Sequence, residues 1–165
     1  MSTEILIIDD EADIREQLAG TLEDEGYLTH KAANSDEALR AVALHKPSLV
    51  LLDIWLQGSD LDGLEILKVL QKDFSRIPVV MMSGHGNIET AVTAINMGAY
   101  DFIEKPFNSD RLLVISSRAL EASRLRRENE ELRERARTED QLIGKSVAIN
   151  QLRQQISKVA PTNSR

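Results

Sequence analysis

Three carboxylates, a hydroxyl and an amine each follow a short hydrophobic run in this sequence. The residues are Asp9, Asp10, Asp53, Ser83 and Lys105. If the hydrophobic runs are parallel strands of one sheet, their carboxyl ends meet at the same edge, where open α/β folds bind ligands. We therefore expect these five side chains to lie together in one site.

The residue types predict the chemistry of that site. Carboxylates sharing a cleft repel one another unless a hard cation binds between them. Mg²⁺ favours a few carboxylates together with water and a phosphate group, so the set indicates phosphoryl transfer rather than calcium storage. The Ser83 hydroxyl and the Lys105 ammonium suit the oxygens of a phosphoryl group. One carboxylate could act as nucleophile and form an aspartyl phosphate.

Length and composition limit the class of protein. The chain has 165 residues, of which 42% are hydrophobic, so we expect one domain with appendages. Residues 1–120 hold 20 Asp and Glu against 10 Lys and Arg, which argues against a nucleic-acid surface there. The absence of cysteine excludes disulfides, thiolate metal sites and cysteine nucleophiles. We see no signal peptide and no apolar run approaching 18 residues, so we expect a soluble, cytoplasmic protein with no membrane contact.

Strand and helix patterns alternate along the chain. The expected strands cover residues 5–9, 27–32, 49–52, 78–83 and 102–103. Apolar residues at helical spacing between them predict helices over 14–25, 35–46, 64–70 and 88–97. This alternation predicts an α/β fold with a flavodoxin-like five-stranded parallel sheet, (βα)5.

The fifth helix is expected to extend beyond the sheet, because residues 109–140 contain no glycine or proline. Read as heptads, this segment has Ala122 and Asn129 at a positions and Leu125 and Leu132 at d positions. An Asn at an a position fixes register in two-stranded coiled coils, which favours a homodimer. The heptads are few and Arg118 occupies the preceding d position, so a single solvated helix remains the alternative.

The polar residues at the strand ends resemble those of the receiver domain of two-component response regulators, over residues 4 to about 120. The resemblance implies that Asp53 is the phosphoryl acceptor and that Asp10 and Asp53 bind Mg²⁺ directly. It also implies that Asp9 acts on Mg²⁺ through water and that the backbone carbonyl of Trp55 is a further ligand. A sensor histidine kinase would supply the phosphoryl group, and the chain would catalyse no reaction besides its own Mg²⁺-dependent phosphorylation at Asp53.

The same resemblance assigns the switch residues. Ser83 matches the switch hydroxyl, Lys105 the phosphate-contacting lysine, and Phe102 the aromatic switch position, where a phenol is missing. Gly84 stands where alanine is common, beside the expected phosphate. The loop over residues 54–63 has no proline and is two residues longer than usual, which leaves access to the site and the lifetime of the phosphate open. Phosphorylation is expected to switch oligomeric state and output.

The tail resembles a second domain. Residues 141–165 look like the opening of the central ATPase domain of sigma-54-dependent activators of the NtrC type, which regulate transcription. The sequence stops before any G-x-x-x-x-G-K motif. We therefore expect a receiver domain over 1–120, a helical linker over 121–140, and a truncated start of the ATPase domain over 141–165. This last segment is expected to stay unstructured or to lie loosely on a neighbouring part. Nucleic-acid binding is expected in another domain, not in this part.

Two rival functions remain open. A phosphatase of the haloacid dehalogenase type also forms an aspartyl phosphate with Mg²⁺, but its first strand should end in D-x-D, whereas this one ends in Asp9-Asp10-Glu11. A structural dimerisation module with vestigial acids is the second rival. The histidines His30, His45 and His85 are scattered along the sequence, so no histidine metal cluster is expected.

Overall fold

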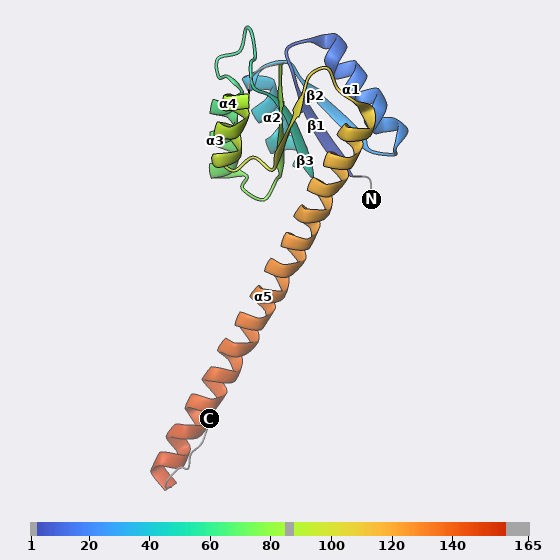
Figure 1. The fold of residues 1–165 in the computed structure, drawn as a ribbon. Helices are drawn as coiled ribbons and strands as arrows, with labels where there is room; N and C mark the ends of the chain where they lie inside the picture. The colour runs from blue at the N-terminus through green and yellow to red at the C-terminus, as the bar shows by residue number, and fades with distance from the viewer. Residues whose placement is uncertain (1–2, 85–87, 158–165) are drawn as a thin grey trace. The chain divides into compact units, whose positions relative to one another are not determined.

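Five parallel strands form a single sheet in the order β2-β1-β3-β4-β5 (Figure 1). The computed structural model describes the backbone of residues 3–84 and 88–157 and the side chains up to residue 139. The strands are β1 (Glu4–Ile8), β2 (Leu28–Ala32), β3 (Leu49–Asp53), β4 (Val79–Ser83) and β5 (Asp101–Glu104). The predicted flavodoxin-like sheet is thus confirmed.

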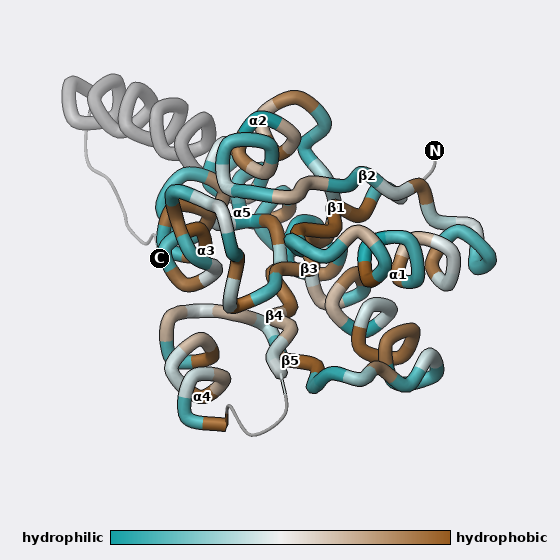
Figure 2. The backbone as a smooth tube through the Cα atoms, turned by 90° about the horizontal axis from the view of Figure 1, so that it is seen from above, coloured by the Kyte–Doolittle hydropathy of each residue, from teal (hydrophilic) through white to brown (hydrophobic). Residues whose placement is uncertain are grey.

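Helices cover both faces of the sheet. They are α1 (Ala12–Asp24), α2 (Ser35–His45), α3 (Gly63–Asp73), α4 (Ile88–Asn96) and α5 (Ser109–Ser157). Successive strand residues point to opposite faces, so Leu6 and Ile8 pack toward α2, α3 and α4, while Ile5 and Ile7 pack toward α1 and the start of α5. Every residue of β3 and β4 is buried, as expected for central parallel strands. The hydrophobic strands lie between more polar helices in Figure 2.

Local sequence sets where the helices nearest the site begin. Asn34 caps α2 by accepting a hydrogen bond from the Glu37 backbone N–H. Asp62 and Glu65 form a reciprocal capping box at the start of α3, each side chain accepting from the other residue's backbone N–H. These caps hold the first turns of α2 and α3 beside the loops that follow β2 and β3.

Helix α5 continues further than predicted. The helix was expected to end at Asp140, but it runs to Ser157, so the expectation of an unstructured tail is wrong for residues 141–157. Residues 158–165 lie outside the described part of the chain. The tail is rich in helix-forming residues, and the cost of about 1 kcal/mol for Gly144 does not interrupt it. No helix of the described residues has an apolar stretch long enough to cross a membrane.

The chain divides into two compact units, residues 1–124 and 125–165. Within the first unit, the start of α5 buries Leu112, Ile115 and Ala119 against the sheet. Within the second unit, Leu125 and Leu132 expose 52% and 60% of their surface in the single chain. These leucines are the predicted d positions, so they are available to a partner helix.

Gly63, the first residue of α3, lies against the backbone at the end of β3. A Cβ atom at this position would lie 2.1 Å from the Asp53 carbonyl oxygen and 2.6 Å from the Ile54 Cα. We expect Gly63→Ala to lower the free energy of unfolding by about 3 kcal/mol, because either the start of α3 or the backbone of Asp53 and Ile54 must shift to make room for the methyl group. Urea unfolding measures this loss.

Gly20 provides the matched control for this substitution. Gly20 lies in α1, is exposed, and has no atom within 4 Å of the position of an added Cβ. Gly20→Ala should therefore stabilise the chain by up to about 1 kcal/mol through helix propensity. Equal effects of the two substitutions would contradict the steric argument for Gly63.

Candidate functional site

Four charged side chains meet at the carboxyl edge of the sheet. Asp9 and Asp10 follow β1, Asp53 is the last residue of β3, and Lys105 follows β5. The Lys105 backbone N–H donates to the Ser83 carbonyl at 2.7 Å, which ties the start of the loop after β5 to the end of β4. The structure therefore brings together residues that are separated by up to 96 positions in the sequence.

The Lys105 ammonium bridges two carboxylates. It donates to Asp9 Oδ2 at 2.9 Å and to Asp53 Oδ2 at 3.0 Å. The side chains of Asp9, Asp53 and Lys105 expose only 0%, 6% and 17% of their surface. Hydrogen bonds between ionised groups at such burial are strong and directional, so Lys105 holds the Asp53 carboxylate in place.

Burial and charge shift the protonation of this site. Burial, followed by the negative charge of Asp9, raises the pKa of Asp53 from 3.8 to about 6, although Lys105 acts in the opposite direction. Burial would lower the pKa of Lys105, but its hydrogen bonds to Asp9 and Asp53 and their charges outweigh this effect and raise it. Lys105 is therefore cationic at neutral pH, and one positive charge does not fully compensate the acids.

The acids have the composition and spacing of a site for a hard divalent cation. One carboxylate oxygen from each of Asp9, Asp10 and Asp53 lies within 4.8 Å of the other two. The pKa of Asp53 is raised because the carboxylate is buried and lies beside Asp9, so a bound cation would favour its ionised form. Oxygen ligands from carboxylates are those that Mg²⁺ prefers, so these residues fit Mg²⁺.

The loop between β3 and α3 also touches the acids. The Gln57 backbone N–H donates to Asp10 Oδ2 at 3.1 Å, and the Trp55 N–H lies 3.4 Å from Asp53 Oδ1. The Trp55 side chain is 54% exposed, so it does not close the site. The contact of Gln57 was not predicted, because a backbone donor leaves no signature in residue type.

A serine pair fastens this loop to the start of α2. The Ser35 N–H donates to Ser59 Oγ at 2.8 Å, and the Leu61 N–H donates to Ser35 Oγ at 3.2 Å. The Ser59 hydroxyl in turn donates to the Leu61 carbonyl at 2.7 Å. The longer loop, whose effect the sequence left open, is thus anchored at residues 59–61 by a closed set of hydrogen bonds.

The predicted switch residues lie on β4 and β5 or directly after β4. Ser83 is buried at the end of β4, at the same edge as the acids, and Gly84 follows it. Phe102 is partly buried in β5 and packs against the core on the side of α2, α3 and α4. The structure thus places Ser83 and Gly84 next to the acidic edge and Phe102 further down the sheet.

Two histidines that are distant in the sequence lie in contact. The rings of His30 and His45 are stacked, with centroids 3.6 Å apart, so these two histidines adjoin in the fold although they are scattered along the sequence. They lie 15 positions apart on a strand and a helix, so only the packing of α2 on the sheet brings them together. His85 falls outside the described residues.

Comparison with known proteins gives a consistent family. Residues 5–116 match the family model described as the response regulator receiver domain. The chain is 56% identical over its whole length to the nitrogen assimilation regulatory protein NtrX of Azorhizobium caulinodans, of which it covers 36%. It is 40% identical to the C4-dicarboxylate transport transcriptional regulatory protein DctD of Pseudomonas aeruginosa, over 96% of this chain and 35% of that protein.

Solved structures agree with these relatives. The receiver domain of NtrX from Brucella abortus is 60% identical, with a TM-score of 0.70 over 71% of this chain and 98% of that one. A longer NtrX structure from the same organism is 57% identical, with a TM-score of 0.79 over all of this chain and 36% of that one. The chain thus spans about a third of the length of the curated relatives it matches.

Proposed function

Because this chain belongs to the response regulator receiver family, with NtrX-type proteins among its relatives, we propose that Asp53 accepts a phosphoryl group from a sensor histidine kinase. The observation that supports this most strongly is the pair of hydrogen bonds from Lys105 to Asp9 and Asp53. They hold a buried carboxylate beside a cation at the sheet edge where a phosphoryl group can enter. The proposed kinase is of the NtrY type, which the similarity to NtrX suggests.

The proposed reaction is an in-line transfer. An oxygen of the Asp53 carboxylate attacks the phosphorus of a phosphohistidine, a P–O bond forms, and the P–N bond breaks with its electron pair passing to the histidine nitrogen. Lys105 keeps the attacking carboxylate oriented and its ammonium compensates negative charge on the phosphoryl oxygens. Beyond this transfer to its own carboxylate, the chain catalyses no reaction.

Mg²⁺ is the cofactor proposed for this transfer. Asp10 and Asp53 would bind it directly, Asp9 through water, and the Trp55 carbonyl would complete the protein ligands, which agrees with the proximity of the three carboxylates. When bound, Mg²⁺ would supply positive charge that offsets the negative charge of the acids and of the phosphoryl group. The Gln57 N–H donates to Asp10 Oδ2, which leaves Asp10 Oδ1 for the ion.

Phosphorylation is proposed to act through a two-state switch. The Ser83 hydroxyl and the Gly84 backbone would bind the new phosphoryl group, and Phe102 would turn toward the space that Ser83 vacates. The output would be a change in oligomeric state, with a homodimer that pairs the exposed Leu125 and Leu132 of two chains. An Asn at position 129 would set the register of that coil.

The remaining assignments concern the longer protein. Residues 1–120 would be the receiver, 121–140 a helical linker, and 141–165 the start of a sigma-54-interacting ATPase domain. The whole protein would regulate transcription in the cytoplasm, with DNA bound by another domain and no nucleic acid contacted by this part. The match of the entire chain to proteins named as transcriptional regulators supports this proposal.

Intact-mass spectrometry tests the acceptor. The chain is incubated with Mg²⁺ and acetyl phosphate, and we expect one hydroxylamine-labile phosphate on the parent and none on Asp53→Asn. The matched control is Asp24→Asn, an exposed carboxylate of α1, which should be labelled like the parent. Retained labelling of Asp53→Asn would overturn the assignment of the acceptor.

The same experiment separates the rival functions. A phosphatase of the haloacid dehalogenase type would place the phosphate on Asp9, which peptide mapping after borohydride trapping would reveal. A structural dimerisation module would show no label with acetyl phosphate and no Mg²⁺ binding. Either result would contradict the receiver mechanism proposed for Asp53.

A further inference from the structure

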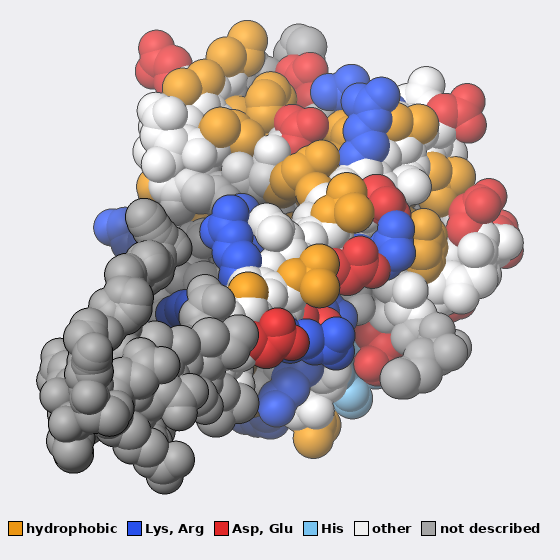
Figure 3. Space-filling model, turned by 90° about the horizontal axis from the view of Figure 1, so that it is seen from below, with side chains coloured by type: hydrophobic (Ala, Val, Ile, Leu, Met, Phe, Trp, Pro, Cys, Tyr) orange, Lys and Arg blue, Asp and Glu red, His pale blue; other side chains and the backbone are white. Residues whose placement is uncertain are grey.

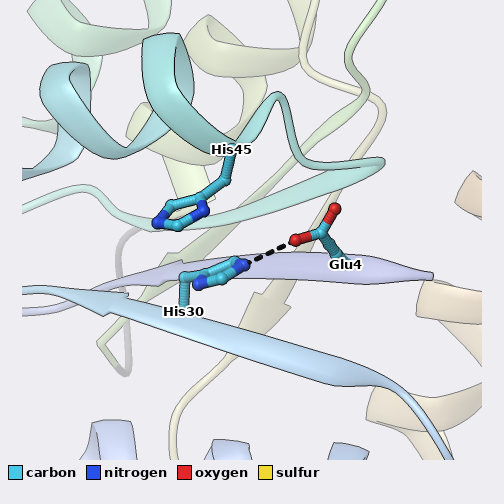
Figure 4. Close-up of side chains that lie close together, drawn as sticks. All are labelled: Glu4, His30 and His45. Carbon is cyan, nitrogen blue, oxygen red and sulfur yellow. Dashed lines mark hydrogen bonds and ion pairs between the residues drawn. The ribbon is translucent and has the colours of Figure 1, made fainter. Parts of the chain in front are cut away.

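We propose that Glu4, His30 and His45 form a second metal site, specific for Zn²⁺, at the edge of the sheet opposite to the acidic site. The three residues offer one carboxylate oxygen and two imidazole nitrogens that all lie within 4.8 Å of one another. Figure 4 shows the His45 ring lying over the His30 ring, with Glu4 beside them and joined to His30 by a hydrogen bond. This inference does not depend on the proposed phosphoryl transfer.

The sheet places two of the ligands side by side. Glu4 pairs with Leu28 and Leu6 pairs with His30, so Glu4 and His30 are diagonal neighbours on the same face of β1 and β2. His30 Nε2 lies 2.8 Å from Glu4 Oε1. The Glu4 and His30 side chains are 32% and 21% exposed, so an ion could reach them while their mobility is restricted.

Helix α2 supplies the third ligand. His45 is its last residue, and its ring stacks on that of His30 at a centroid distance of 3.6 Å and an interplanar angle of 12°. Among the residues that the structure describes, the His45 ring nitrogens have no hydrogen-bond partner. A metal ion would give one of these nitrogens a partner.

The ligand set selects the metal. Two imidazoles and one carboxylate are a recognised Zn²⁺ set, with metal–ligand distances of about 2.0–2.2 Å and water in the fourth position. Tetrahedral coordination at these distances separates ligand atoms by about 3.3 Å. The atoms that would bind already lie within 4.8 Å of one another. The stacked rings are nearly parallel, so the His45 ring must turn out of the stack before both imidazoles can direct a nitrogen at one ion. Mg²⁺ prefers oxygen ligands, so it should not compete here.

The charges near this site are mixed, because the exposed Lys46 directly follows His45 while the end of α2 contributes partial negative charge. The carbonyls at the C-terminus of α2 carry partial negative charge beside His45, which stabilises positive charge there. Lys31, the nearest cation on β2, points to the other face of the sheet and pairs with Glu16 of α1 at 2.7 Å. On the view from below in Figure 3, a histidine side chain reaches the surface and acidic and basic side chains are interspersed.

The two metal sites lie at opposite ends of β1. Glu4 begins this strand and Asp9 follows its last residue, a separation of about 17 Å at roughly 3.3 Å per residue. Zn²⁺ at the Glu4 end would therefore be a separate ion, and it would join β1, β2 and α2. At a free concentration about 100 times its dissociation constant, it should raise the Tm by about 5–10 °C.

Calorimetric titration of the chain with Zn²⁺ in excess Mg²⁺ tests the proposal. We expect one Zn²⁺ per chain, and His30→Gln and His45→Gln should each weaken binding by at least about tenfold. Co²⁺ used as a probe should give the visible absorption of a tetrahedral complex in the parent and lose it in both variants. The matched control is His85→Gln, which removes the remaining histidine and should leave Zn²⁺ binding unchanged.

Other outcomes would overturn the site. The site would be contradicted if the parent did not bind Zn²⁺, or if binding survived in both His30→Gln and His45→Gln. Loss of Zn²⁺ binding in Asp10→Asn would also contradict it. The melting curve of each variant in EDTA establishes that it is folded. Labelling with acetyl phosphate should match that of the parent in the folded His30 and His45 variants, so failure of this proposal is distinguishable from failure of the receiver mechanism.

Discussion

Lys105→Met should destabilise the Mg²⁺-free chain by about 3–5 kcal/mol at pH 8 and slow the phosphorylation of Asp53 by roughly a hundredfold or more. The substitution leaves two buried carboxylates without their shared cation, while methionine preserves most of the packing volume. Asp9 and Asp53 have side-chain exposures of only 0% and 6%, so solvent screens their repulsion poorly. Excess Mg²⁺ should recover part of the lost stability, because it supplies another positive charge to the same carboxylates.

Urea unfolding measures the loss of stability, and the initial rate of acetyl phosphate labelling measures the loss of transfer. The control is Lys31→Met, which breaks the more exposed pair with Glu16 on α1. That substitution should cost no more than about 1 kcal/mol and leave the labelling rate unchanged. If both lysine variants lost the same stability, the bridge of Lys105 would have no special energetic role.

Asp53→Asn should stabilise the Mg²⁺-free chain by about 2–3 kcal/mol above pH 7, and the gain should vanish below about pH 4. The pKa of Asp53 is about 6 in the folded chain, against an ordinary value of 3.8. Between these values the folded state holds a proton that the unfolded state has lost, so stability falls as the pH rises. Above pH 6 the carboxylate is charged and its full cost is present, whereas asparagine carries no charge at any pH.

Thermal and urea unfolding of parent and variant in EDTA, over pH 4–8, measure this difference. Asp24→Asn is the control, since its exposed carboxylate should change stability by less than about 0.5 kcal/mol across the range. A gain for Asp53→Asn that is constant with pH would show that burial and the charge of Asp9 do not shift the pKa of Asp53. With excess Mg²⁺ the stability advantage of Asp53→Asn over the parent should shrink, because the ion binds the Asp53 carboxylate of the parent more tightly than the asparagine of the variant.

The sheet and the position of the acidic edge were predictable from sequence because both follow from local patterns. The four apolar residues before Asp53 indicate a central parallel strand. The polar residue that ends such a strand lies at the carboxyl edge of the sheet. The family resemblance then implied roles for Asp53 and Lys105. The structure adds the distances between them, while the roles themselves remain predictions for the labelling experiments.

Contacts set by tertiary packing were not predictable in the same way. The pairing of Ser35 with Ser59 joins the first residue of α2 to a loop without periodicity, and neither serine carries a signal of its own. The stack of His30 on His45 depends on how far α2 runs before it ends and on how it packs across β2. The end of α5 was misplaced because glycine at position 144 costs less than the surrounding helix formers contribute.

The serine contact at the start of α2 gives this helix a mechanical role. One end of α2 is hydrogen-bonded through Ser35 to the loop whose Gln57 N–H touches Asp10, and the other end carries His45. Its 11 residues form a rod about 16 Å long. An ion that displaced this rod at His45 would change the affinity for Mg²⁺ at Asp10, and Mg²⁺ would change the affinity for that ion by the same factor. Helix α2 thus contacts residues at both edges of the sheet, through Ser35 at one end and His45 at the other.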